Sequence, residues 1–180
     1  MFHFLADRPV LDFLATIAER GTTDEEKLQA PGDLAAWVAE SGLVSAPVAV
    51  SVDQLAAAVR LREAMDRVLG ARIDGARPAR EDRELVNAAA RRPQPIPRLT
   101  GTGGLERAGD LDAVLAALAC DCIELFAGRD GALLRRCADP ACTRLYVDRS
   151  HGQRRRWCEM KGCGDRAKAA AYRRRRRAQR

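Results

Sequence analysis

The stretch RRCADPACTRLYVDRSHGQRRRWCEMKGCGDR, residues 135–166, decides how the C-terminal part of the chain folds. It holds two cysteine pairs, Cys137 with Cys142 and Cys158 with Cys163, with four residues inside each pair and fifteen between the pairs. Two close pairs joined by a short spacer are typical of one tetrahedral metal site where thiols are kept reduced. Because thiolates suit zinc, we predict that these four cysteines bind one structural Zn²⁺ per chain.

Two other interpretations of the cysteines stay open at the level of sequence. An iron–sulfur cluster would use the same four thiolates, and four separate structural cysteines would bind no metal. The remaining two, Cys120 and Cys122, are predicted to be small core residues of a helix. His151 is predicted to be exposed, because four cysteines already complete a tetrahedron.

The residues around the cysteines predict a small zinc finger. CADPAC is typical of a turn that presents two thiolates, RLYVD of a strand, RSHGQ of a turn and RRRWC of the partner strand. Asp165 is placed to cap a helix through RAKAAAYRRRRR. About fifty residues bury too little apolar surface to fold unaided, so zinc would supply on the order of 10 kcal/mol. The apolar side chains expected to pack around it are Leu145, Tyr146, Val147, Trp157 and Met160.

Charge is divided unevenly along the chain. Residues 131–180 hold 16 Lys and Arg against 4 Asp and Glu, a net charge of +12, whereas residues 1–130 hold 15 against 21, a net charge of −6. Zinc on four thiolates would bring the C-terminal value to about +10. Because the arginines are clustered, above all in Arg173–Arg177, binding of a polyanion is favoured over a solvated tail that aids solubility.

The N-terminal part has the pattern of a mainly helical domain. The predicted helices are 7–21, 33–42, 51–70, 80–90 and 111–127. Their start and stop signals are Asp7 and Gly21, Asp33 and Gly42, and a Ser51–Gln54 capping box. Prolines in 93–97 exclude a helix there, and IPRLT and GLERA are predicted to pair as a β-hairpin.

Composition limits the class of protein. At 180 residues, with 47% apolar and 4% aromatic residues, the chain fits one mainly helical domain plus a small module. Gly128 and Gly131 mark the expected hinge, which gives domains 1–128 and 129–180. No apolar run approaches 18 residues, and MFHFLADRPVLDFL shows neither a basic leader nor a cleavage site. We therefore expect no membrane span, no signal peptide and a cytoplasmic location.

The C-terminal stretch resembles the CGNR zinc finger of bacterial proteins, which implies a treble-clef-like fold. Asp165 stands where that family has Asn, and Asp could not reproduce a bidentate contact of Asn with adenine. The matching residues are Cys137, Cys142, Tyr146, Asp148, Ser150, Arg155, Arg156, Trp157, Cys158, Met160, Cys163, Gly164 and Arg166.

The N-terminal part resembles the ABATE domain, through LDFLAT, DLAAWVAESGLV and LRRC. Ala15 replaces the Asn of the first of these motifs, so this chain is not expected to make the contact that such an Asn would make with a ligand. The resemblance implies a stress-induced transcription regulator.

The predicted function is therefore zinc-dependent nucleic-acid binding by a transcription regulator, with DNA favoured over RNA. The N-terminal domain would sense a small molecule or a protein effector, and a homodimer is compatible with the sequence. The predicted nucleic-acid contacts are Arg154, Arg155, Arg156, Arg166, Lys168, Arg173, Arg174, Arg175, Arg176 and Arg177.

Three other function classes compete with this prediction. An RNA- or ribosome-associated protein would use the same arginines, and a zinc-stapled protein-interaction module would not bind nucleic acid. No enzyme is predicted, because four cysteines close the metal site and the chain has no Gly-rich phosphate loop, HExxH motif or nucleophile elbow.

Overall fold

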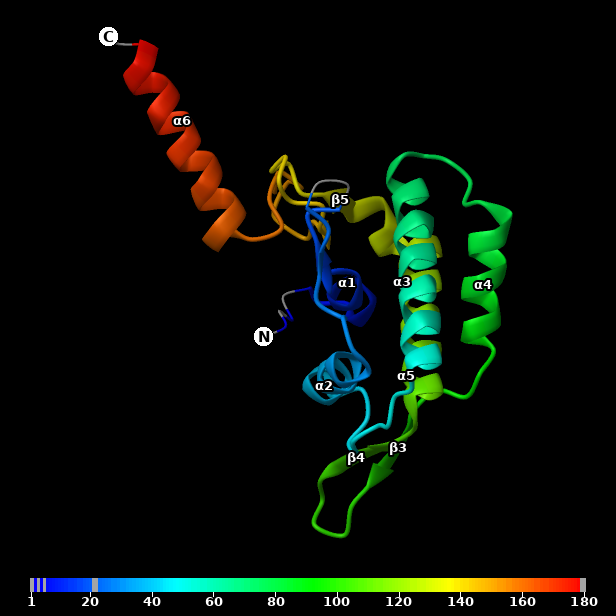
Figure 1. The fold of residues 1–180 in the computed structure, drawn as a ribbon. Helices are drawn as coiled ribbons and strands as arrows, with labels where there is room; N and C mark the ends of the chain where they lie inside the picture. The colour runs from blue at the N-terminus through cyan, green and yellow to red at the C-terminus, as the bar shows by residue number, and fades with distance from the viewer. Residues whose placement is uncertain (1, 3, 5, 21–22, 179–180) are drawn as a thin grey trace.

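Five helices build the N-terminal body of the computed structural model, which describes residues 2, 4, 6–20 and 23–178. Helices α3, α4 and α5 lie side by side, and α1 and α2 pack against α3 (Figure 1). The bounds are Pro9–Leu14 for α1, Pro31–Ser41 for α2, Val52–Ile73 for α3, Arg80–Ala90 for α4 and Leu111–Ala127 for α5. This confirms a mainly helical body. No helix in the described ranges is long and apolar enough to cross a membrane.

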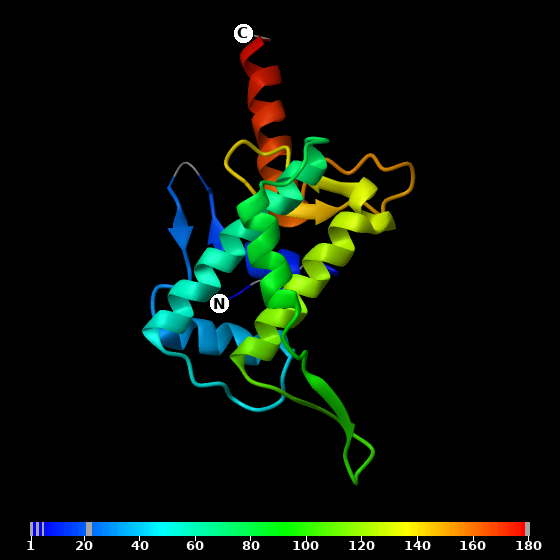
Figure 2. The same cartoon turned by 90° about the vertical axis from the view of Figure 1, so that its right-hand side faces the viewer.

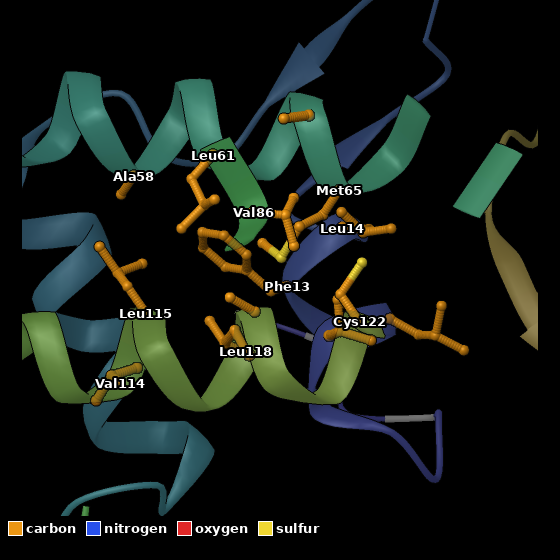
Figure 3. Packing of buried hydrophobic residues seen from close by; sticks show 14 of the residues in the cluster. Phe13, Leu14, Ala58, Leu61, Met65, Val86, Val114, Leu115, Leu118 and Cys122 are labelled. Carbon is orange, nitrogen blue, oxygen red and sulfur yellow. The ribbon is translucent and has the colours of Figure 1, made fainter. Parts of the chain in front are cut away.

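One apolar core fills the space between these helices (Figure 3). Helix α5 contributes an apolar face to it, on which Leu118, Cys122 and Leu125 are fully buried. Cys120 is half-buried beside this core. Both thiols are free, and burial raises the pKa of Cys122 to about 12, which keeps it protonated and inert. Other helices contribute Phe13, Leu14, Ala58, Leu61, Met65 and Val86.

Local signals in the sequence set several helix ends. Ser51 and Gln54 form the predicted capping box at the start of α3, with hydrogen bonds of 2.8 and 3.2 Å. Gly42 ends α2 in the left-handed region at φ 66°. Asp33 is not the cap of that helix: it lies at the third position and accepts hydrogen bonds from the backbone of Gln29 and Ala30. The helix therefore begins at Pro31.

The first helix is much shorter than predicted. It ends at Leu14, and Ile17–Ala18 forms strand β1, paired with β2 at Glu25–Glu26. The cause is tertiary: Thr16 accepts a 2.9 Å hydrogen bond from the guanidinium of Arg62, which is 1% exposed and also bound by Glu26. Asp7 does not cap the helix, which follows Arg8. The predicted stop, Gly21, lies outside the described residues.

The predicted β-hairpin is confirmed. Strands β3, Ile96–Leu99, and β4, Leu105–Ala108, pair antiparallel with Ile96 opposite Ala108 and Leu99 opposite Leu105. The hairpin extends away from the helices (Figures 1 and 2), and its large apolar side chains are exposed.

The C-terminal part contains the short helix η1 at Arg129–Leu133, strands β5 at Leu134–Arg136 and β6 at Leu145–Val147, a turn at Met160–Gly164, and α6 at Asp165–Ala178. Strand β6 pairs with β5, so the prediction that RRRWC is its partner is wrong. Residues 154–158 stay irregular because their backbone is bound elsewhere: Arg155 N–H donates to Asp148, and Arg156 C=O accepts from Ala138.

This part is not joined to the body by an open hinge. Leu134 and Leu145 are buried in the core of the body, and Val147 packs against it. At Gly131 a Cβ atom would lie 2.7 Å from the carbonyl oxygen of Leu125, so close packing requires glycine there. The division into domains 1–128 and 129–180 remains a proposal about how the chain folds.

Candidate metal centre and nucleic-acid interface

Four elements bring the four cysteine sulfurs together. Cys137 follows β5, Cys142 precedes β6, Cys158 ends the irregular segment, and Cys163 lies in the turn before α6. The turn between the first two is held by Asp139, whose carbonyl accepts from Cys142 N–H at 2.8 Å and whose carboxylate accepts from Ala141 N–H. All four Sγ atoms lie within 4.8 Å of one another.

The spacing of the sulfurs fits a tetrahedral zinc ion. Cys158 Sγ lies 3.7 Å from both Cys142 Sγ and Cys163 Sγ. Zn–S bonds of about 2.3 Å in a tetrahedron place sulfurs about 3.8 Å apart. Four thiolates also leave no open coordination position, so the site is suited to a structural ion and offers no position for a substrate.

The electrostatics of the cluster favour a cation at its centre. The hydrogen bond from Cys158 lowers the pKa of Cys142 to about 5, and the same interaction raises the pKa of Cys158. Burial, together with interactions with Cys142, raises the pKa of Cys163 to about 12. One thiolate thus opposes the ionisation of the next, and a dication among the sulfurs removes this opposition.

A very small apolar core surrounds the cluster. Tyr146 is buried against the cysteines, and Trp157 packs beside them half-buried. Leu145 and Val147 were expected here too, but strand alternation turns them to the opposite face of β6, into the core of the body. Met160 was also expected to pack, yet its side chain is 54% exposed. Two aromatic rings are therefore the main apolar groups around the metal position.

Arg155, a predicted nucleic-acid contact, is built into the finger. Its guanidinium donates to the backbone carbonyls of Trp157 and Cys158 and lies 4.8 Å from the centre of the Tyr146 ring. The Tyr146 hydroxyl donates to Arg155 C=O at 2.6 Å. These bonds make Arg155 a brace of the loop that carries Cys158.

A buried carboxylate organises the same loop. Asp148 is fully buried and accepts hydrogen bonds from the backbone and hydroxyl of Ser150 and from Arg155 N–H. The bonds from Ser150 hold the pKa of Asp148 below its usual range. The matching positions Tyr146, Asp148, Ser150 and Arg155 of the sequence thus form one hydrogen-bonded unit.

Arg166, a second predicted contact, lies in the first turn of α6 and is held there by partners in the finger. Its Nε lies 2.8 Å from a carboxylate oxygen of Asp139, and its Nη2 donates to Cys163 Sγ at 3.0 Å. This links the start of α6 to the first cysteine turn and brings a positive charge to the cluster. Sequence reasoning missed Asp139, although a carboxylate inside CADPAC is a signal for such a partner. Asp165 lies in the first turn of α6, 3.6 Å from Lys168.

The other predicted contacts face solvent. Arg154, Arg156, Lys168 and the run Arg173–Arg177 are all exposed, as is His151. Arg156 lies over the Trp157 ring at 5.4 Å. Helix α6 leaves the cluster and projects away from the rest of the molecule (Figures 1 and 2). Arg180 lies outside the described residues.

Comparison with known families gives one match in the N-terminal body and one in the C-terminal part of the chain. Residues 7–129 match ABATE, described as "Putative stress-induced transcription regulator". The chain belongs to the ABATE family. Residues 134–176 match the CGNR zinc finger. Both families are of regulatory or zinc-finger type, and no curated protein matches the chain.

Two features of the ABATE protein concern what it can bind. Zinc is its cofactor, since a CGNR zinc finger and four adjacent cysteines coincide. Ala15, which replaces the Asn of the ABATE motif, lines a cavity of about 40 Å³ between α1 and β6. Asp12, Arg144 and Tyr146 line the same cavity. A cavity of this size has room for little more than solvent.

Proposed function

We propose that this protein is a zinc-dependent DNA-binding transcription regulator that uses Cys137, Cys142, Cys158 and Cys163 to hold the metal. The observation that carries the proposal is the charge and isolation of α6. The helix holds seven Lys and Arg against one Asp, and within the described residues its main contact is with the turn at Met160–Gly164. Arginines three and four residues apart repel each other, so a polyanion that neutralises them would stabilise the helix.

The zinc cluster would fix the orientation of α6 relative to the body. Arg166 fastens the first turn of the helix to the cysteine turn, and β5 and β6 fasten the finger to the body. A shift in the body would therefore reach α6 through packed elements. We assign the regulatory input, from a small molecule or a protein, to the N-terminal body on this ground.

The phosphate contacts would come mainly from the exposed basic residues. Because Arg155 and Arg166 already have partners in the finger, eight of the ten predicted residues remain as the principal candidates. They are Arg154, Arg156, Lys168 and Arg173–Arg177.

The proposal is tested by fluorescence anisotropy with a labelled DNA duplex and a structured RNA of equal length at matched salt. If about five to eight residues touch duplex phosphates, log affinity falls against log salt with a slope of roughly −4 to −7. Replacing Arg173–Arg177 by Gln should weaken binding and flatten that slope. Salt-independent binding, or none near 100 mM salt, would instead support a protein-interaction module. Tighter binding of RNA would support the RNA-associated alternative.

A homodimer remains part of the proposal. Palindromic sites and two-fold symmetric regulators commonly go together, because each subunit reads one half-site. Light scattering of the zinc-loaded protein, alone and with DNA, measures the oligomeric state directly, and a monomer in both conditions contradicts the dimer.

A further inference from the structure

The side chains of α6 are not the same all around the helix. Successive residues are about 100° apart, so positions i, i+3, i+7 and i+11 share one face. On α6 that face carries Asp165, Lys168, Tyr172 and Arg176, all exposed. The opposite side carries the half-buried alanines Ala167, Ala170 and Ala171 among arginines. One face thus offers a carboxylate, an ammonium, a phenol and a guanidinium, while the rest of the helix offers methyl groups and guanidinium groups.

Tyr172 is the unexpected member of this face. It is 59% exposed, and among the described residues it has neither a ring neighbour nor a hydrogen-bond partner. The chain has only two tyrosines and two tryptophans, and the others are buried or half-buried. An exposed aromatic ring on a projecting helix adds nothing to packing in this fold. The exposure of Tyr172 therefore indicates that the ring contacts a binding partner. Lys168 and Arg176, one turn away on either side, make that partner anionic.

Phosphates and base edges are contacted by different kinds of protein side chain. Phosphate oxygens are contacted by any cation that reaches them, and such contacts carry no sequence information. Base edges in the major groove present donors, acceptors and the thymine methyl group, which call for acceptors, donors and apolar surface on the protein. On α6 these three kinds of group occur together only on the Asp165–Tyr172–Arg176 face.

We infer that α6 enters the major groove of duplex DNA with this face toward the base edges, and that Tyr172 is its central specificity-determining residue. The inference rests on the proposed DNA-binding function. The groove is about 12 Å wide and admits one α-helix, with bases on its floor and phosphates on both walls. Arg173 and Arg175 then lie to either side of Tyr172, toward the walls.

The same geometry separates Tyr172 from Arg166. Although the Arg166 side chain is 58% exposed, its guanidinium is held by Asp139 and Cys163. It would position the helix in the groove, and Tyr172 would read the sequence.

The experiment selects preferred duplexes from a random pool with the zinc-loaded full chain, then compares a selected and a scrambled duplex. Tyr172→Ala should weaken the selected duplex about tenfold and leave both the scrambled duplex and the salt slope unchanged. The matched control is Arg173→Gln, the next residue, which lies about 100° around the helix and toward a phosphate wall of the groove. It should weaken both duplexes equally and flatten the slope by about 0.9. Tyr172→Phe separates the ring from the hydroxyl.

The outcomes distinguish this inference from the function beneath it. If the chain binds DNA but Tyr172→Ala weakens both duplexes equally, or neither, or if selection enriches no sequence, the inference fails and the proposed function stands. If the chain binds no duplex DNA, both fail. Circular dichroism of the Tyr172→Ala protein with its zinc content checks that α6 and the finger remain folded.

Discussion

The body and the finger of this protein are stabilised by different physics. The body buries more than twenty apolar side chains between five helices, and its polar groups mostly stay outside that core. The finger packs one buried and one half-buried aromatic ring beside four cysteines, and side-chain hydrogen bonds satisfy the backbone of its loops. Apolar burial suffices for the first, whereas the second needs a metal to offset chain entropy.

The two regions nevertheless pack against each other through one common interface. Leu134 and Leu145 belong to the strands that flank the first cysteine turn, yet their side chains complete the core of the body. The strand pair β5–β6 thus presents Tyr146 to the zinc cluster and its neighbours to the helices. A region stabilised by metal is thereby anchored on one stabilised by packing.

The largest expected effect is loss of the metal. A Cys158→Ser, Cys163→Ser double variant should lose the single zinc equivalent and the folded finger, because about 10 kcal/mol of binding free energy is removed. The body should stay helical. Metal analysis with limited proteolysis measures both effects, and an unchanged zinc content would exclude these two cysteines as ligands.

A truncation after Gly128 comes next. The body should still melt cooperatively, because its helices and caps are complete, but at a lower temperature than in the full chain because Leu134 and Leu145 are missing. A full-length Leu134→Ala variant should lose about 2–5 kcal/mol of stability, as other buried leucines do. Calorimetry of the three proteins decides the matter, and a disordered 1–128 fragment would show that the two regions fold only together.

Arg155→Ala and Arg154→Ala form a matched pair of neighbours. Arg155 holds two carbonyls and stacks on Tyr146, so its loss should cost the finger about 1–3 kcal/mol and raise the rate of zinc release to a chelator. Arg154 is exposed like Arg155, but its side chain makes no hydrogen bond within the described residues, so its loss should leave zinc release unchanged and weaken nucleic-acid binding. Equal zinc release by the two variants would contradict the bracing role of Arg155.

Acid should separate the two regions by pH. The hydrogen bond from Arg67 lowers the pKa of Asp82 in the body, so this pair stabilises the fold above the unfolded pKa near 3.9 and loses its effect as the pH falls through the folded value. Protons compete with zinc for the cysteine thiolates. We expect this competition to release the metal at a higher pH than the pH at which Asp82 is protonated. Tryptophan fluorescence and zinc release during an acid titration should show the finger lost first, and simultaneous loss would contradict separate stabilisation.

The smallest expected effect concerns the ion pair between Arg166, in the first turn of α6, and Asp139. Arg166→Ala and Asp139→Ala should each cost little, and a double-mutant cycle should give a coupling of about 0.5–1 kcal/mol, since the guanidinium is more than half exposed. Thermal melting of the zinc-loaded variants measures this, and no coupling would mean that the pair does not fix the helix.

Sequence alone determined the features that depend on neighbours along the chain. Helices 80–90 and 111–127, the Ser51–Gln54 capping box, the β-hairpin and the four-cysteine pattern all follow from local spacing and residue type. These are the features in which periodicity, caps and ligand spacing act within a few residues.

Only the tertiary structure decided the rest. Helix α1 stops at Leu14 because Arg62, far along the chain, binds Thr16, and β6 pairs with β5 because residues 154–158 are held by Asp148 and Ala138. Arg155 and Arg166 read as nucleic-acid contacts in a basic sequence, yet the fold gives them partners at carbonyls, a carboxylate and a sulfur. An arginine side chain is long, and its role depends on which acceptors the fold brings within its reach, which spacing along the chain does not record.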